Sequence, residues 1–397
     1  IAVMSFAQTS IKVQTHNVVA ADEQFNVTFI IEGENSPSDF TWSAGNDFQV
    51  LWGPQSGHSV STRIINGQRS RSEQSTYTYV LMPKATGKFA IPTATAKVKG
   101  KEIKSVSKTI EVAAAGAASS RQQGQQGQSQ GQTAQRQQTG VSDEDIFLTL
   151  ELSRRNVVVG EPITATLKLY QRVNVAGFEN VTFPDFNGFW SQEIEAPTNI
   201  EFTREVYEGQ IYNSALLRKF ILIPQQQGAV KITPADLVCL VNVRVASVGN
   251  SIFDGFFDDY RTIRKRVTSQ EVTVNVSPLP SGAPASFAGG VGKFEISASL
   301  SKDVLKTHEA GSLVVTVTGT GNVSLLEAPK VSFPPDMEVY DTKISDRIDK
   351  SGISGSKYYE FPFIPRSHGD FVIEPIKYSY YDVNTKKYVT LETPAIP

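Results

Sequence analysis

Hydrophobic and polar positions alternate along most of the chain. Strict alternation runs from Phe25 to Ile31, and the same period of two recurs at residues 77–81 and 89–91. A period of two places one face of a strand in a core and the other in water. No long window has the i, i+3, i+4, i+7 spacing of an amphipathic helix, and turn signals such as Asn66-Gly67 and Lys99-Gly100 separate the segments. The pattern predicts a nearly all-β protein.

Two stretches of different composition interrupt this pattern. Residues 116–140 include ten glutamines and no large apolar side chain, so they bury too little surface to offset the entropy of ordering them. Residues 277–290 are rich in proline and glycine. We therefore expect a signal-peptide remnant at 1–7, a β-sandwich at 8–115, a Gln-rich flexible linker at 116–141, a second sandwich at 142–277 with a loop at 247–266, a Pro/Gly linker at 278–291 and a third sandwich at 292–397.

The three long segments repeat one another. A proline that ends a strand-like run recurs at an interval of 141 residues, and a glycine follows each proline four residues later. A glutamate also precedes an alternating run near the start of each segment. Proline removes a ladder donor and glycine permits a tight corner, so we predict three tandem Ig-like antiparallel β-sandwich domains. The residues are Pro83, Pro224, Pro365, Gly87, Gly228, Gly369, Glu23, Glu161 and Glu309.

Composition and charge argue against several function classes. The formal net charge is −2, a field too weak to attract a polyanion, so nucleic-acid binding is not expected. The single cysteine, Cys239, lies in an apolar run and is predicted to be a buried structural thiol. The four histidines lie far apart in the sequence, and no nucleophile–base pair can be named. We therefore expect no catalytic residue, no metal ligand, no cofactor and no enzymatic activity.

The first residues bear on localisation. Ser5-Phe6-Ala7 after an apolar start is similar to the small-x-small cleavage site of a secretory signal peptide. No later run reaches the roughly 18 apolar residues that a transmembrane helix needs. An exported protein is expected, with any membrane anchor outside this chain.

One stretch is the best candidate for a functional site. Residues 252–260 combine aromatic and acidic side chains and are followed by the basic run 261–266. The aromatics either fold back as a small core of their own or form a partner-binding site, in which aromatic side chains contribute most of the binding energy. The partner-site residues would be Phe253, Asp254, Phe256, Phe257, Asp258, Asp259 and Tyr260.

The order of several motifs resembles that of the BatD oxygen-tolerance family. The resemblance covers essentially the whole chain, and these motifs carry it: Tyr77-Thr-Tyr79-Val-Leu81-x-Pro83, Gly87-x-Phe89-x-Ile91, Lys99-Gly100-Lys101, Phe183-Pro-Asp-Phe, Phe333-Pro-Pro-Asp and Tyr359-x-Phe361-x-Phe363-Ile-Pro365.

This resemblance implies a periplasmic β-domain protein, anchored to the inner membrane by a helix further along the full-length chain. It also implies an operon shared with a MoxR-type ATPase and with membrane proteins that carry von Willebrand A domains, and a link to aerotolerance. The family offers no catalytic residues to carry over. By the same analogy, Asp254, Asp258 or Asp259 would complete the metal of a von Willebrand A-type partner.

Together these observations predict a non-enzymatic extracytoplasmic scaffold in a membrane-associated complex. The alternative is a cell-surface adhesin or a carbohydrate-binding protein, in which Trp42, Trp52 and Trp190 would stack on sugar rings.

Overall fold

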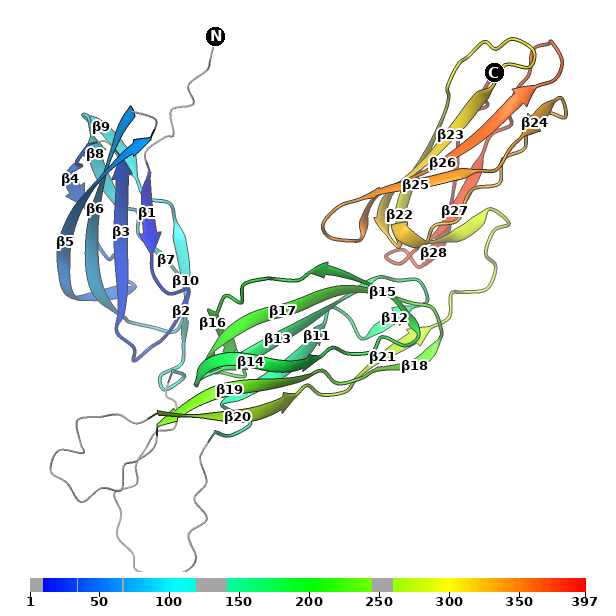
Figure 1. The fold of residues 1–397 in the computed structure, drawn as a ribbon. Coiled ribbons are helices and arrows are strands. Elements are labelled where there is room, and N and C mark those ends of the chain that lie inside the picture. The colour runs from blue at the N-terminus through cyan, green and yellow to red at the C-terminus, as the bar shows by residue number, and fades with distance from the viewer. Residues whose placement is uncertain (1–9, 34, 66–67, 119–140, 245–259) are drawn as a thin grey trace, which may run out of the picture.

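The computed structural model describes residues 10–33, 35–65, 68–118, 141–244 and 260–397 (Figure 1). These residues form β-strands, and the only helical element among them is the short 3-10 turn η2 (Val323–Leu325). The expected all-β class is therefore confirmed. Three hydrophobic cores follow one another along the chain. We call the segments that contain them the first (10–118), second (141–277) and third (287–397) β regions. The expected signal-peptide remnant at 1–7 and the turn at Asn66-Gly67 lie outside the described residues.

The first β region has three sheets around one core. Its strands are β1 (Ile11–Gln14), β2 (Val18–Ala20), β3 (Phe25–Gly33), β4 (Ser38–Thr41), β5 (Phe48–Ile65), β6 (Gln68–Pro83), β7 (Gly87–Ile91), β8 (Thr95–Val98), β9 (Lys101–Lys104) and β10 (Lys108–Ala113). The sheet orders are β1-β3-β6-β5, β2-β10-β7 and β4-β8-β9. The apolar positions from Phe25 to Ile31 are buried, as the alternation predicts. Lys99 and Gly100 both have positive φ, as a two-residue type I′ hairpin turn requires.

The second β region repeats this plan with strands of 3 to 15 residues. They are β11 (Ile146–Leu152), β12 (Asn156–Val158), β13 (Ile163–Gln171), β14 (Asn174–Thr182), β15 (Phe189–Glu195), β16 (Thr203–Tyr207), β17 (Gln210–Pro224), β18 (Gly228–Ile232), β19 (Asp236–Arg244), β20 (Tyr260–Thr268) and β21 (Val272–Ser277). The sheets are β11-β13-β17-β15 with β16 beside β17, β12-β21-β18, and β14-β19-β20. In both regions a short strand, β2 or β12, runs parallel to the last strand, β10 or β21, while most other pairs are antiparallel.

The third β region begins earlier than the sequence suggests. Its strands are β22 (Phe287–Leu300), β23 (Gly311–Gly321), β24 (Met337–Val339), β25 (Lys343–Ile348), β26 (Ser354–Pro365), β27 (Lys377–Asp382) and β28 (Lys387–Glu392). They form the order β24-β26-β23-β22-β27-β28, with β25 beside β26. Phe287 and Val291 pair with β27, and Ala288 is buried in the core. Residues 287–291, expected at the end of the Pro/Gly linker, therefore belong to a strand because their apolar side chains find a core.

The repeated proline and glycine mark the same corner in every region. Strands β6, β17 and β26 end at Pro83, Pro224 and Pro365. The glycines four residues later have positive φ values of 136°, 110° and 155° at Gly87, Gly228 and Gly369. L-residues rarely adopt such values, so the corner interpretation of the repeat is confirmed.

The repeated glutamate also has one structural role in all three regions. Each side chain accepts a hydrogen bond from the backbone N–H three residues earlier: Glu23 from Ala20 (3.0 Å), Glu161 from Val158 (3.1 Å) and Glu309 from Lys306 (2.9 Å). The glutamate N–H in turn donates to the carbonyl of that same earlier residue. These reciprocal bonds close the turn that leads into β3, β13 or β23, and we call it the glutamate turn.

Candidate interaction surfaces

The aromatic and acidic stretch follows β19 in the sequence and ends on the first residue of β20. Phe253, Asp254, Phe256, Phe257, Asp258 and Asp259 lie outside the described residues. Tyr260, the remaining member of the predicted site, begins β20 opposite Arg244 and is 60% exposed. A tyrosine this exposed contributes little to a core, so Tyr260 is available for contact with another molecule.

The strand that begins with Tyr260, β20, is basic, and its charged side chains pair with acidic side chains of the second region. Arg264 pairs with Glu179 on β14 at 3.0 Å, Lys265 with Asp143 at 2.5 Å, and Arg266 with Asp236 at 3.0 Å. Hydrogen bonds from Arg266 and Thr268 hold the pKa of Asp236 below its usual range. β20 is the edge strand of its sheet, and these charges both fix it in place and discourage further strand pairing.

A polar cluster inside the second region has no catalytic arrangement. Ser214 donates to Glu205 at 2.7 Å, and Lys168 donates to the same carboxylate at 3.0 Å. Burial alone would raise the pKa of Glu205, but these hydrogen bonds outweigh it and keep the pKa below the ordinary value. Tyr170 also donates to Glu205, at 3.2 Å. A carboxylate that is this well satisfied is a poor general base for Ser214, so the cluster serves to fasten β13, β16 and β17 together.

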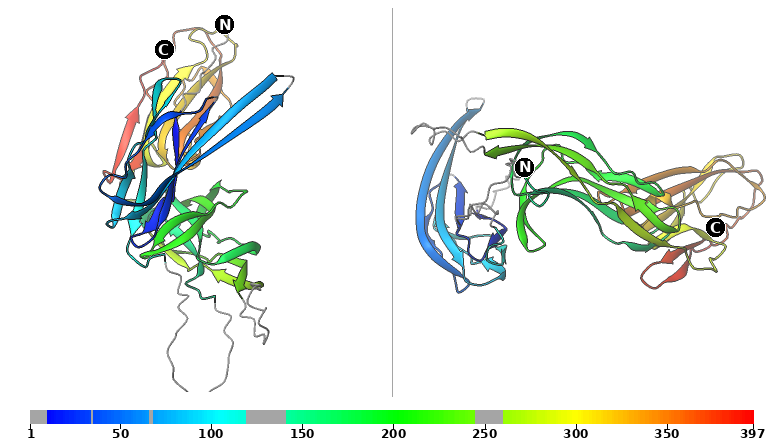
Figure 2. Two further views of the ribbon diagram at one scale, coloured as in Figure 1. Left: turned by 90° about the vertical axis from the view of Figure 1, so that its left-hand side faces the viewer. Right: turned by 90° about the horizontal axis from the view of Figure 1, so that it is seen from below.

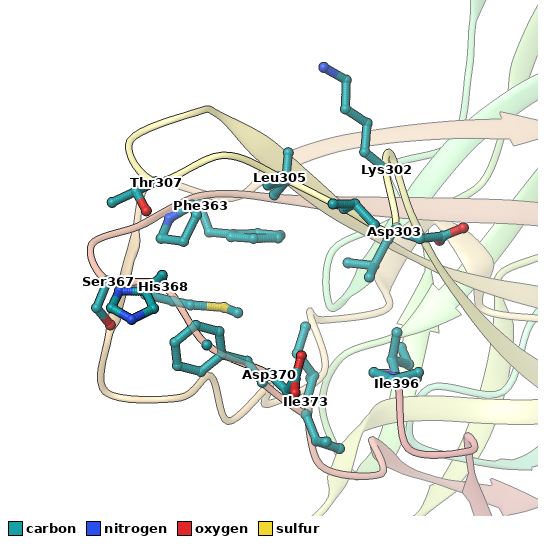
Figure 3. Close-up of a pocket in the computed structure, with 18 residues that line it drawn as sticks. Lys302, Asp303, Leu305, Thr307, Phe363, Ser367, His368, Asp370, Ile373 and Ile396 are labelled. Atoms are coloured by element: carbon teal, nitrogen blue, oxygen red, sulfur yellow. The ribbon is translucent and has the colours of Figure 1, made fainter.

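A cavity of about 520 Å³ opens at the end of the third region. Phe363 and Ile373 line it with other apolar side chains, while Ser367 and His368 lie at one end and Asp303 at the other (Figure 3). Lys302 points away from the cavity in Figure 3 and pairs with Glu309 at 2.5 Å. The polar groups do not converge on one point, so this cavity lacks the focused set of donors and acceptors typical of a small-molecule site.

Of the remaining candidate residues, Cys239 and Trp42 have structural environments, and Trp52 is exposed. Cys239 is buried, and burial raises the pKa of its thiol to about 11, which makes it unreactive. Trp42 packs on the first core and donates to the Pro92 carbonyl at 2.8 Å, and Trp190 is half-buried, whereas Trp52 is 54% exposed. Among the described residues, no group of three or more His, Cys, Asp or Glu side chains is arranged to hold a metal ion.

A contact between the first and second regions was not foreseen from the sequence. Arg204 on β16 donates to both carboxylate oxygens of Glu23, at 2.8 and 3.0 Å, and these side chains are only 17% and 26% exposed. The Asn17 amide donates to the Arg204 carbonyl at 2.9 Å. Alternation along β16 explains the contact, because Arg204 and Val206 face the first region while Glu205 faces Ser214 of its own region.

A small apolar cluster lies beside this ion pair. Val18 and Ala20 of β2 pack with Ala117 and Ile211, all at most 5% exposed, and the Ile211 N–H donates to the Ala117 carbonyl at 2.9 Å. Ala117 was expected to belong to the flexible linker. We call the ion pair and this cluster together the first junction.

The second and third regions meet through glycines. A Cβ on Gly160 would lie 2.8 Å from a methyl of Val291, and one on Gly352 would lie 2.8 Å from Ile221. Asn322 fixes the neighbouring chain by accepting from the Val291 N–H at 2.7 Å and donating to the Gly289 carbonyl at 2.8 Å. We call this apolar contact the second junction.

No helix among the described residues is long and apolar enough to cross a membrane. The comparison with curated proteins gave no match.

Solved structures of low similarity include a broadly conserved Escherichia coli adhesin, FdeC, at 12% identity and a TM-score of 0.15, with 97% of this chain and 96% of that chain covered. Invasin, a bacterial integrin-binding protein, gives 12% identity and a TM-score of 0.16 over 98% of this chain and 60% of its own. The type II cohesin dyad from the adaptor ScaA scaffoldin of Acetivibrio cellulolyticus gives 10% identity and a TM-score of 0.16, with 62% of this chain and 92% of that chain covered. Similarity at this level says nothing about the function of the chain.

The family comparison is more specific. The model described as "BatD DUF11 like domain" matches residues 12–112 and 298–397. The two matches correspond to most of the first region and of the third, so the same domain type occurs at both ends of the described chain. Together they cover half of the sequence, and the chain belongs to the BatD family.

Proposed function

We propose that this protein is a non-enzymatic interaction protein of a membrane-associated complex linked to oxygen tolerance. It acts in the periplasm, is anchored to the inner membrane by a segment outside this chain, and engages membrane proteins that carry von Willebrand A domains. Membership of the BatD family supports this proposal, and so does a fold whose described ionisable clusters serve to fasten strands together.

The location of the contact rests on one observation, the exposure of Tyr260 at the end of β20. Three regions joined by specific contacts would carry this hairpin at a fixed place. The aromatic side chains next to it in the sequence would anchor the partner, and Asp254, Asp258 or Asp259 would supply a carboxylate to the partner's divalent cation.

Capture of the partner by the full-length protein tests the proposal. Replacing Phe256 and Phe257 by Ser is expected to abolish capture and to leave the melting temperature nearly unchanged. Phe202→Ser is the matched control, since Phe202 is another exposed aromatic of the second region, at 38%, and capture should persist. Unfolding of the double variant would instead assign these aromatics to a core and contradict the proposed site.

The carboxylates are tested separately. Asp258→Asn and Asp259→Asn should weaken capture when a divalent cation is present. An equal loss in the presence of a chelator would rule out a metal bridge and leave an aromatic contact alone.

A further inference from the structure

Strand β5 leaves one edge of its sheet open. It is the terminal strand of the order β1-β3-β6-β5 and is 18 residues long. Every residue from Gln49 to Thr62 is exposed, and Figure 2 shows the hairpin of β5 and β6 projecting from the rest of the first region. An edge strand presents unpaired N–H and C=O groups that can pair with another strand.

The other edges of the molecule are protected by charge. In the described part of the chain, every other edge strand longer than three residues carries at least one charged side chain. β20 carries four arginines and lysines, and β25 carries Lys343, Asp346 and Arg347. β5 also carries one charged residue, Arg63 close to its end, but its 14 residues from Gln49 to Thr62 include no Asp, Glu, Lys or Arg. Charges on an edge oppose pairing with a further strand, so the stretch from Gln49 to Thr62 lacks this protection.

The outer half of β5 is also regular. Its ladder with β6 shifts register twice near Trp52, whereas from Gln55 onward the pairing runs without a shift. Bulges and prolines disturb an edge, and here Pro54 and the register shifts are confined to the base of the hairpin. The stretch from Gln55 to Thr62 is therefore a regular edge, with a contour length of about 27 Å at roughly 3.4 Å per residue.

The side chains of this stretch indicate what pairs with it. Gln55, Gly57, Ser59 and Ser61 alternate with Ser56, His58, Val60 and Thr62. Small hydroxyl side chains offer little contact area for a specific peptide, but each hydroxyl both donates and accepts, so serine and threonine can bond to one another across a strand pair. When the strand pairs with an identical one, no like charges are brought opposite each other.

We propose that the outer edge of β5 pairs antiparallel with the same strand of a second copy of this chain. The pairing joins two β1-β3-β6-β5 sheets across a two-fold axis, which gives a closed dimer. The exposed apolar side chains Val50, Leu51 and Trp52 at the base of the strand, 39–54% exposed, add area next to the ladder. A contact made mainly by main-chain groups is small, so the dimer should be weak, with a dissociation constant of about 10 µM to 1 mM.

Sedimentation velocity of the full chain over a concentration series tests this dimer. The wild type should shift from monomer to dimer within that range. Ser59→Lys places like charges across the two-fold pairing and should weaken dimerisation at least about tenfold. Ser345→Lys, at an exposed position of the already charged β25, is the matched control and should have no effect. A wild type that stays monomeric at about 1 mM, or equal loss in both variants, would overturn the proposal.

A second measurement does not depend on charge. Cys239 is buried, so a cysteine introduced on the surface is the accessible thiol. Single variants Ser56→Cys, Ser59→Cys and Thr62→Cys should form disulfide-linked dimers on mild oxidation, most efficiently at the position nearest the two-fold axis. Ser345→Cys should not. Linkage of the β5 cysteines to a different protein, with none between copies, would show that another strand occupies the edge and would contradict self-pairing.

Discussion

The two junctions use the same turn of successive regions in different ways. In the first region, the turn before β3 places Glu23 against Arg204 of the second region. In the second region, the equivalent turn before β13 places Gly160 against Val291 of the third. The corresponding Glu161 bonds within its own region, to Arg154 at 2.6 Å. One turn thus contacts the next region through an ion pair, and its counterpart does so through close apolar packing.

The residue before each turn glutamate shows the same contrast. Asp22 accepts a hydrogen bond from the Gly116 N–H at 3.0 Å, where the chain leaves the first region. Gly160 occupies the equivalent position and contacts Val291, where the chain enters the third region. The sequence that connects the first region to the second is long and polar, so specific bonds at the first junction are needed to hold these two regions together. The connection after the second is short, and shape complementarity is sufficient.

The largest effect is expected from Gly160→Val, which would break the second junction. Gly160 has a φ of 85°, and its Cβ would meet Val291 at 2.8 Å, so backbone strain and overpacking combine to cost about 2–5 kcal/mol. Gly228→Val is the control, because Gly228 has a φ of 110° with no atom within 4 Å of the added Cβ. It should cost only about 1–3 kcal/mol. Calorimetric melting measures both, and equal losses would mean that the close contact at Gly160 does not matter.

A smaller effect is expected from Arg204→Ala at the first junction. This change removes two charge-assisted hydrogen bonds from a partly buried carboxylate and should weaken the contact by about 1–3 kcal/mol. The radius of gyration from small-angle X-ray scattering should rise as the first region separates from the second. Arg154→Ala removes the equivalent partner of Glu161, but Arg154 is 60% exposed, so the cost should be under about 1 kcal/mol and the radius unchanged. The same radius in both variants would refute the special role of Arg204.

The smallest effect is a pH dependence confined to the first junction. Burial would raise the pKa of Glu23, but hydrogen bonds from Arg204 and the Ala20 N–H, with the charges of Arg204 and His16, keep it below the ordinary 4.5. A lowered carboxyl pKa stabilises the junction above pH 4.5, and this contribution is lost as the pH falls further through the pKa of the folded state. Glu23→Gln should remove this part of the acid response, as followed by scattering between pH 7 and 3. An unchanged response would assign the acid sensitivity to other carboxylates.

Much of the fold is readable from the sequence because it depends on local pattern. Alternation predicts the strand at Phe25, and the repeated Pro224 and Gly228 predict a corner that positive φ confirms. The glutamate of each turn is visible in the sequence as a repeat. The basic side chain that pairs with that glutamate is not. Arg204 lies 181 residues from Glu23. Nothing in the local pattern indicates that Arg204 contacts another region, or that its neighbour Glu205 faces the opposite side of β16.

The candidate sites are less predictable for a similar reason. A run of uncharged residues such as 49–62 indicates an open edge only when the sheet order places β5 last, and sheet order is a non-local property. The exposure of Tyr260 likewise depends on where β20 lies in its sheet. Phe253, Phe256 and Phe257 lie outside the described residues, so their role stays a prediction.

Photo-crosslinking in the native envelope tests the proposed function most directly. A photoreactive phenylalanine analogue at Tyr260 of the full-length protein, 60% exposed, is compared with the same analogue at Tyr340 of the third region, 46% exposed. A crosslink to a membrane protein that carries a von Willebrand A domain is expected from position 260 and not from position 340. A crosslink to such a protein from position 340 alone, or from neither position, would contradict the proposed function.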